Sequence, residues 1–182
     1  RLDGVTGVQT CALPILKMCI AASQAVQKNE FVKARIIIGK ALELASIIGK
    51  APELASRINA IENGYMLKRG RITQVLPVFI GMSRSGSTPD RIEGYKGMVA
   101  CYEAEYDAES RRTIEGETYD ARKTRIKTAS EKRDRDIALA YDGAASFISG
   151  LSTSEIEKNA DAVQALLQQI FAFRSARNEN DV

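Results

Sequence analysis

IALAYDGAASFI, residues Ile137–Ile148, is the stretch around which the rest of the chain is organised. Four of its apolar residues recur at i, i+4, i+7 and i+11, which is the period of an amphipathic helix: Ile137, Tyr141, Ala144 and Ile148. Gly143 interrupts this pattern, although glycine inside a helix costs about 1 kcal/mol relative to alanine. A glycine at such a position indicates that another backbone or side chain comes close. The stretch therefore predicts a helix whose apolar face is closely packed by a neighbour.

Composition indicates an all-α protein. Of the 182 residues, 45% are hydrophobic but only 6% are aromatic, Trp is absent and Pro numbers 4. This length supports one good core or two small ones, and this composition favours helices over a β-sandwich. We expect antiparallel helical bundles with a long charged connector helix.

The side chains that enzymes and metal sites use most are scarce. His is absent, which removes the most common general base and metal ligand. The three cysteines, Cys11, Cys19 and Cys101, lack metal-ligand spacing, and their odd number is typical of reduced thiols in a cytoplasmic protein. The sequence therefore argues against an enzyme and predicts no cofactor and no metal.

The charge pattern bears on the kind of partner. The net charge is +3, and basic and acidic residues are mixed along the chain, so we expect no nucleic-acid binding. No apolar run approaches the ~20 residues of a membrane span, so we expect no membrane insertion. A protein partner is the class that these patterns leave, and they do not indicate an oligomeric state.

Residues 1–15 are set apart by their sequence. Val5–Ile15 reads VTGVQTCALPI, which looks like the translation of a sequencing-library adapter joined to a truncated reading frame. We expect this segment to be non-native and keep it out of the fold. The alternative is a natural loop or short strand that is broken at Pro14.

Residues 16–82 are predicted to form a helical bundle. Helices are expected over Leu16–Gln27, Phe31–Ile48 and Glu53–Arg71, and a fourth apolar run follows at Ile72–Met82. The second helix carries an apolar stripe in alternating threes and fours: Phe31, Ala34, Ile38, Ala41, Ala45 and Ile48. Such a stripe is buried against neighbouring helices.

Residues 83–127 are predicted to be a linker and a charged helix. Ser83–Pro89, SRSGSTP, is expected to be a loop in which Thr88 caps the next helix. Asp90–Arg135 is highly charged and only sparsely apolar, which is typical of a solvated helix or of a partly flexible connector.

Residues 128–182 are predicted to be a second helical unit. Thr128 and Glu131 have the spacing of a capping box that opens the Ile137–Ile148 helix, and Gly150 ends that helix. Ser152 and Glu155 repeat the capping device before a last helix. The apolar face of that helix is expected to contain Val163, Leu166, Ile170 and Phe173, broadened by Leu167 and Phe171.

Gly81–Thr88, GMSRSGST, also resembles a phosphate-binding loop. A Gly-rich turn between a strand and a helix can cradle phosphates with its backbone N–H groups. The wider stretch PVFIGMSRSGST is similar to the sulfonate-donor loop of sulfotransferases. A sulfotransferase fragment would require a strand over Val75–Gly81, whereas the other interpretation is a plain linker that ends in a helix cap.

Four stretches resemble parts of the flagellin export chaperone family of the FliS type. Thr128–Ser130 followed by LAYDGAASFI is similar to that family's opening, a TAS stretch before a helix of the form LYDGAxxFL. Lys28–Ile47 and Glu53–Arg69 resemble its next two helices, and Ser154–Phe173 resembles the second one again. Because the opening helix follows the later ones, the resemblance implies a tandem or permuted and truncated relative.

The resemblance implies a function. A chaperone of this type would hold the disordered C-terminal segment of flagellin as helices in apolar grooves and prevent premature assembly until export. The groove would be formed by Tyr141, Ala144, Phe147 and Ile148. Gly143 would allow a close approach, and Asp142 would accept a hydrogen bond from the partner or from a neighbouring helix.

A second resemblance overlaps the first. NEFVKARIIIGKALEL, which begins at Asn29, is similar to the end of a tetratricopeptide repeat, and Leu67–Gly70 resembles the turn of the next repeat. That alternative is a helical scaffold for protein–protein interaction. Helical periodicity is also satisfied by a plain bundle in which every apolar stripe packs inside.

Overall fold

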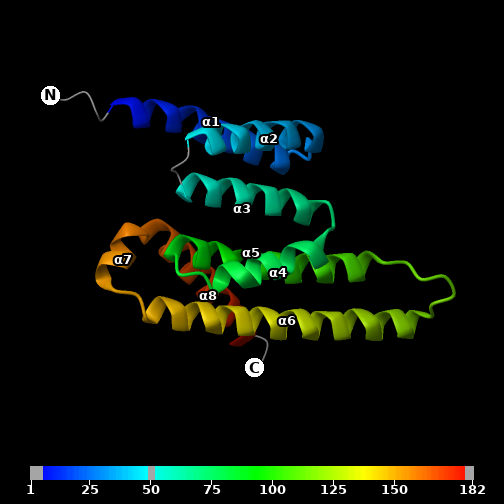
Figure 1. Cartoon of the computed structure of the whole chain (residues 1–182). Coiled ribbons are helices and arrows are strands. Elements are labelled where there is room, and N and C mark those ends of the chain that lie inside the picture. The colour runs from blue at the N-terminus through cyan, green and yellow to red at the C-terminus, as the bar shows by residue number, and fades with distance from the viewer. Residues whose placement is uncertain (1–5, 49–51, 179–182) are drawn as a thin grey trace. The chain divides into compact units, whose positions relative to one another are not determined.

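The computed structural model describes residues 6–48 and 52–178. These residues form eight helices and no strand, so the all-α prediction is confirmed for them (Figure 1). In chain order the helices are α1 Thr6–Gln27, α2 Phe31–Ile48, α3 Pro52–Lys68, α4 Ile72–Ser83, α5 Thr88–Arg111, α6 Tyr119–Ser149, α7 Thr153–Lys158 and α8 Ala160–Asn178.

The chain divides into two compact units, residues 1–71 and residues 72–182. From the sequence we expect this boundary after Met82, with the apolar run Ile72–Met82 in the first bundle. In the structure that run forms α4, which packs against α5 and so belongs to the second unit. Gly70 lies at the end of the first unit with a φ of +72°, a left-handed conformation that glycine adopts readily after a helix.

Unit 1 consists of α1, α2 and α3, each packed against the other two. Its core is built from small and branched apolar side chains: Ile15, Cys19, Ala22, Ile38, Ala41 and Ile58. Asn29, with a φ of +59°, forms the turn between α1 and α2. The predicted end of the first helix at Gln27 and the start of the second at Phe31 are both confirmed.

The first helix begins earlier than the sequence analysis expects. α1 starts at Thr6, continues through Pro14, and buries Ile15 completely. The alternative of a loop or strand broken at Pro14 is therefore wrong for residues 6–15. The adapter origin of residues 1–15 stays a prediction, and residues 1–5 lie outside the described residues.

In unit 2, α4 lies against α5 at very short range. The buried stripe of α4 is Val75, Phe79 and Ser83, and it faces two buried glycines of α5. A Cβ atom at Gly97 would lie 2.1 Å from Cδ1 of Phe79, and one at Gly94 would lie 2.3 Å from the backbone nitrogen of Ser83. Glycine at both positions is what allows the two helices to approach this closely.

Two interpretations of the segment around α4 are corrected. Residues 75–81 are helical, so the strand that the sulfotransferase alternative requires is absent. The loop before α5 is shorter than predicted, because Ser87 takes the N-cap position and Thr88 is the first helical residue. The Thr88 hydroxyl instead donates a hydrogen bond of 3.5 Å to the Glu155 carboxylate.

The charged segment is mostly helical, and none of residues 102–136 is buried, so its side chains stay largely solvated. It folds as α5 and the first half of α6, two antiparallel helices that pack along one another in a hairpin (Figure 1). α6 begins at Tyr119, where the Thr118 hydroxyl accepts a hydrogen bond of 3.2 Å from the Ala121 N–H. The predicted capping box at Thr128–Glu131 is therefore wrong, because these residues lie inside α6.

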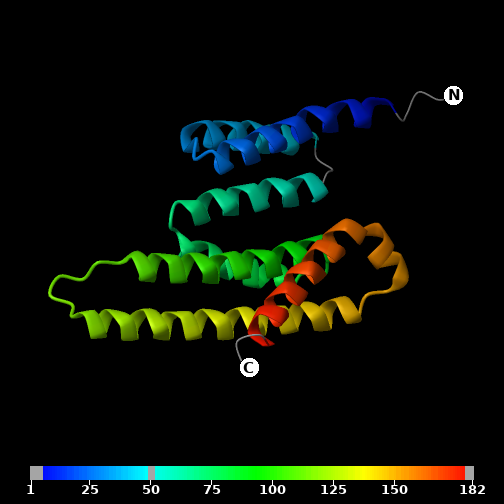
Figure 2. The ribbon, with the colours of Figure 1, turned by 180° about the vertical axis from the view of Figure 1, so that it is seen from behind.

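The end of unit 2 follows the predicted caps. Gly150 is the C-cap of α6, and Ser152 and Glu155 form a complete capping box at the start of α7. The predicted last helix is divided in two, because Asn159 caps the end of α7 before α8 begins. Figures 1 and 2 show α8 crossing the α5–α6 hairpin diagonally.

Candidate protein-binding face

Four of the six predicted partner-binding residues lie together on one side of α6, and we call them the α6 face: Tyr141, Ala144, Phe147 and Ile148. All four are buried, with at most 9% of each residue exposed. They share one core cluster with Ile92 and Tyr95 of α5 and with Val163, Leu166 and Ile170 of α8. The predicted groove is therefore filled by the chain itself.

Gly143 marks a close approach between α6 and α5. A Cβ at this position would lie 3.1 Å from Cε1 of Tyr95, so the close neighbour that the sequence predicts is the ring of Tyr95. The same ring packs on Phe147 at a centroid distance of 6.2 Å. The guanidinium of Arg91 lies over the ring of Phe147, 4.1 Å from its centroid.

α8 covers the α6 face with an amphipathic stripe. Val163, Leu166 and Ile170 follow one another at i, i+3 and i+7, and each is at most 3% exposed. One turn further on, the ring of Phe173 packs on Tyr141 at a centroid distance of 5.3 Å. Phe171, which the sequence analysis assigns to the buried face, is instead 63% exposed.

Asp142 lies beside the α6 face and points to α8. Its carboxylate accepts a hydrogen bond of 2.9 Å from Nη2 of Arg174, so the neighbouring helix supplies the donor. Both side chains are more than half exposed, and ion pairs of this kind contribute about 0–1 kcal/mol to stability. Two exposed apolar residues lie nearby: Leu139 is one turn before Asp142 on α6, and Phe171 is one turn before Arg174 on α8.

Burial sets the protonation state of the titratable groups near this core. Burial raises the pKa of Tyr141, and the Glu103 carboxylate adds to that shift. Burial also raises the pKa of the Cys101 thiol to about 11, with a further contribution from Glu105. At neutral pH both groups are therefore uncharged and act as packing side chains.

A hollow of about 160 Å³ that the sequence does not predict lies between α5 and α6. Its walls include Tyr102 and Tyr106, and Arg133 stacks over the Tyr106 ring at 4.3 Å. Lys132 bridges the helices with a 2.7 Å ion pair to Glu105, whose hydrogen bond raises the pKa of the Lys132 ammonium group. Lys132 also pairs with Asp136, which lines the hollow too. Arg133 pairs instead with Asp134 and Glu109 with Arg125, and these two partners lie outside the lining. The sequence signal for it is the i, i+4 repeat of tyrosines on α5.

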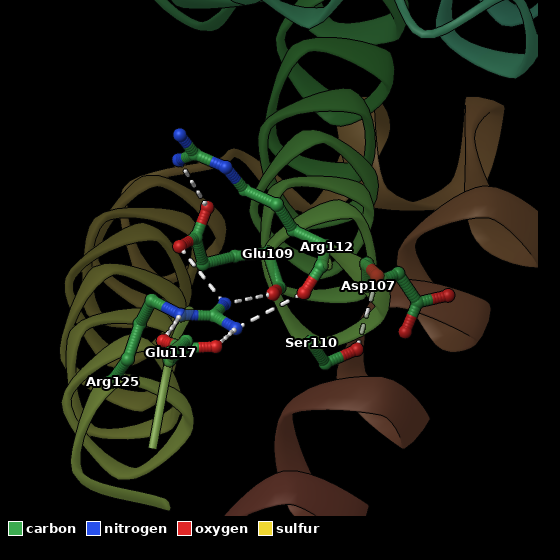
Figure 3. Close-up of polar contacts among 6 residues, drawn as sticks. All are labelled: Asp107, Glu109, Ser110, Arg112, Glu117 and Arg125. Atoms are coloured by element: carbon green, nitrogen blue, oxygen red, sulfur yellow. Dashed lines mark hydrogen bonds and ion pairs between the residues drawn. The ribbon is translucent and has the colours of Figure 1, made fainter. Parts of the chain in front are cut away.

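The tip of the α5–α6 hairpin is held by Arg125 (Figure 3). Its guanidinium donates to both carboxylate oxygens of Glu117, at 2.7 Å and 2.9 Å, and to the Glu109 carboxylate at 3.1 Å. It also donates to the backbone carbonyls of Glu109 and Arg112, the latter at 3.0 Å. These carbonyls lie at the end of α5, and the Glu109 carbonyl also accepts a hydrogen bond of 3.3 Å from the Arg112 N–H. The hydrogen bond to Arg125 is the main reason that the pKa of Glu117 is lowered.

Two general searches of the described residues bear on the class of protein. Within residues 6–48 and 52–178, no helix combines the length and apolar character that a membrane crossing requires. The same part of the chain contains no group of three or more His, Cys, Asp or Glu side chains that could hold a metal ion.

The fold and this face define an all-α protein whose second unit is a helical hairpin covered by a crossing helix. Comparisons with protein-family models, with curated proteins and with solved structures found no match to this chain.

Proposed function

We propose that the protein is a cytoplasmic, chaperone-like module that binds an amphipathic helical segment of a partner protein on the α6 face. The resemblance of LAYDGAASFI to the flagellin export chaperones suggests the partner, the disordered C-terminal segment of flagellin. Binding of this kind couples folding of the partner segment to burial of its apolar side chains. The partner would be held as a helix and kept from premature assembly.

The observation that supports this proposal is the position of α8. An amphipathic helix already lies on the α6 face, with Val163, Leu166 and Ile170 as its buried anchors. Helix recognition in apolar grooves commonly uses anchors at this spacing. Each fully buried side chain of this size is worth about 1.5–3 kcal/mol. An incoming helix must therefore bring apolar anchors of similar size to take the same place.

The proposal is tested by titrating the isotope-labelled full-length chain with a flagellin C-terminal peptide. We expect saturable amide chemical-shift changes that concentrate on residues 141–148 and on α8. The control is the same peptide with its apolar anchors replaced by Ser, which should cause no change. A lack of saturable shifts would contradict the proposal, and shifts confined to residues 6–71 would favour the helical-scaffold alternative.

A further inference from the structure

We infer that α8 is a strap, a helix that leaves the α6 face as one piece and so controls access to it from within the chain. The inference rests on the proposed function, because it concerns the same face. It adds a regulatory element, since the free protein would be closed and a partner helix would have to replace α8.

The rest of unit 2 has packing of its own that does not involve α8. Phe79 of α4 fits against Gly97 of α5, and Tyr95 of α5 fits against Gly143 of α6. At the other end of the hairpin, Arg125 joins the end of α5 to α6. Departure of α8 would leave these contacts in place and would uncover the part of the α6 face that α8 covers, where Phe173 packs on Tyr141. Phe147 would stay against Tyr95.

The contacts that hold α8 are of a kind that a second helix can reproduce. Its three buried anchors are aliphatic, and apolar contact has no directional requirement. The C-terminal half of α8 is held by the Phe173–Tyr141 ring contact and by the Arg174–Asp142 ion pair, which is exposed to solvent. A partner helix with equivalent anchors can therefore replace α8 without leaving a buried polar group unpaired.

The segment between α6 and α8 is attached to the core through Leu151, which is half-buried against it. None of the side chains of α7 is buried. The segment runs from Gly150, the C-cap of α6, to Asn159, the C-cap of α7. Its capping box joins Ser152 and Glu155, which both lie within this segment. A 3.5 Å hydrogen bond from Thr88 links it to α5. α7 can therefore travel with α8.

The test locks α8 with a crosslink that can be cut. In a Cys11→Ser background, Asp142→Cys and Arg174→Cys replace the ion pair with thiols on the two helices, while Cys19 and Cys101 stay buried. A short bismaleimide with an internal disulfide joins the new thiols, and a reductant cuts it. We expect the locked full-length protein to bind the labelled flagellin C-terminal peptide at least about tenfold more weakly than the same protein after cutting, because affinity scales with the open fraction.

The matched control places both thiols on α6, as Ser146→Cys with Ser149→Cys, where both residues are exposed. The same reagent then spans one turn of α6 and does not tie α8. Binding of the peptide should be the same before and after cutting.

Amide hydrogen exchange of the free full-length protein tests the opening of α8 without any peptide. Amides of α8 should exchange at least about tenfold faster than those of Ile137–Ile148 in α6, because a strap opens while α6 stays packed.

The outcomes separate the two proposals. Equal binding by the locked and cut protein refutes the strap while the protein still binds the peptide. Absence of binding in every form refutes the proposed function, and hydrogen exchange then decides the strap. If α8 is protected as strongly as Ile137–Ile148, the strap is wrong; if α8 exchanges faster, the strap stands as a property of the fold.

Discussion

Tyr95 and Gly143 lie against one another between α5 and α6, and the hydroxyl oxygen of Tyr95 is 3.4 Å from where a Cβ of Gly143 would stand. The aromatic ring therefore takes the space that a side chain at Gly143 would fill. This contact accounts for the glycine inside the YDGA stretch, because a larger residue would force the Tyr95 ring to move away.

Gly143→Leu should destabilise unit 2 by about 1–3 kcal/mol, because the added side chain overlaps the Tyr95 ring and forces the helices apart. Thermal unfolding followed by circular dichroism measures the effect. Gly81→Leu is the control in the same unit, since nothing lies within 4 Å of a Cβ there. Equal melting temperatures for the two variants would contradict the close approach at Gly143.

Gly97→Ala should destabilise the α4–α5 contact by a similar amount, about 1–3 kcal/mol, because its Cβ would lie 2.1 Å from Cδ1 of Phe79. The second change Phe79→Ala removes the atoms that clash, which are Cγ, Cδ1 and Cε1 of the ring. The double variant should therefore lose less stability than the sum of the two single variants. Additive losses in urea unfolding would show that the residues do not meet.

Arg125→Gln should remove a pH-dependent part of the stability. The folded-state pKa of Glu117 is lowered from its ordinary value of 4.5, chiefly by its hydrogen bond to Arg125. The contribution of this pair is therefore complete above the unfolded-state pKa and is lost as the pH falls through the folded-state pKa. The melting temperature of the variant should be lower than that of the unmodified protein at pH 7, and the gap should narrow towards pH 3. A gap that stays constant over this range would rule out a role for the Glu117 charge.

Arg174→Glu should weaken the attachment of α8 by at most about 1 kcal/mol, because the ion pair with Asp142 is exposed to solvent. The exchanged pair Asp142→Arg with Arg174→Glu should recover most of the loss. Both effects should shrink at high salt, as screening requires. Melting temperatures at low and high ionic strength measure this, and a loss that salt does not change would point to packing instead of charge.

Cys101 should be inert towards thiol reagents in the folded protein. It is fully buried, and burial raises the pKa of its thiol to about 11, so the reactive thiolate is scarce at pH 8. In a variant with Cys11→Ser and Cys19→Ser, the remaining thiol should react with Ellman's reagent only when denaturant unfolds unit 2. Rapid reaction without denaturant would contradict the burial of Cys101.

Much of the helical order could be predicted from local signals. Gly150 as the end of α6 and the capping box of Ser152 with Glu155 are both confirmed, because each depends on hydrogen bonds within a few residues. The same kind of signal fails at Thr128–Glu131, where the capping pattern lies inside a helix that Thr118 already caps. A local capping pattern shows where a helix can begin. Here the helix begins earlier, directly after the loop that follows α5.

The long-range contacts could not be predicted in this way. Gly94 and Gly97, spaced i and i+3, carry a signal for close helix packing that the surrounding charges obscured. Lys132 and Glu105 illustrate the reason, because a charged residue on a helix looks solvated until its partner on another helix is known. The assignment of α4 to unit 2 depends on the same contacts.

By itself the sequence determined that the chain is helical and that α6 presents an apolar face around a glycine. Only the tertiary structure decided that Tyr95 of α5 and the stripe of α8 cover this face. The physical reason is that periodicity reports which side of a helix must leave water, and the hydrophobic effect, having no direction, does not specify which element will cover it.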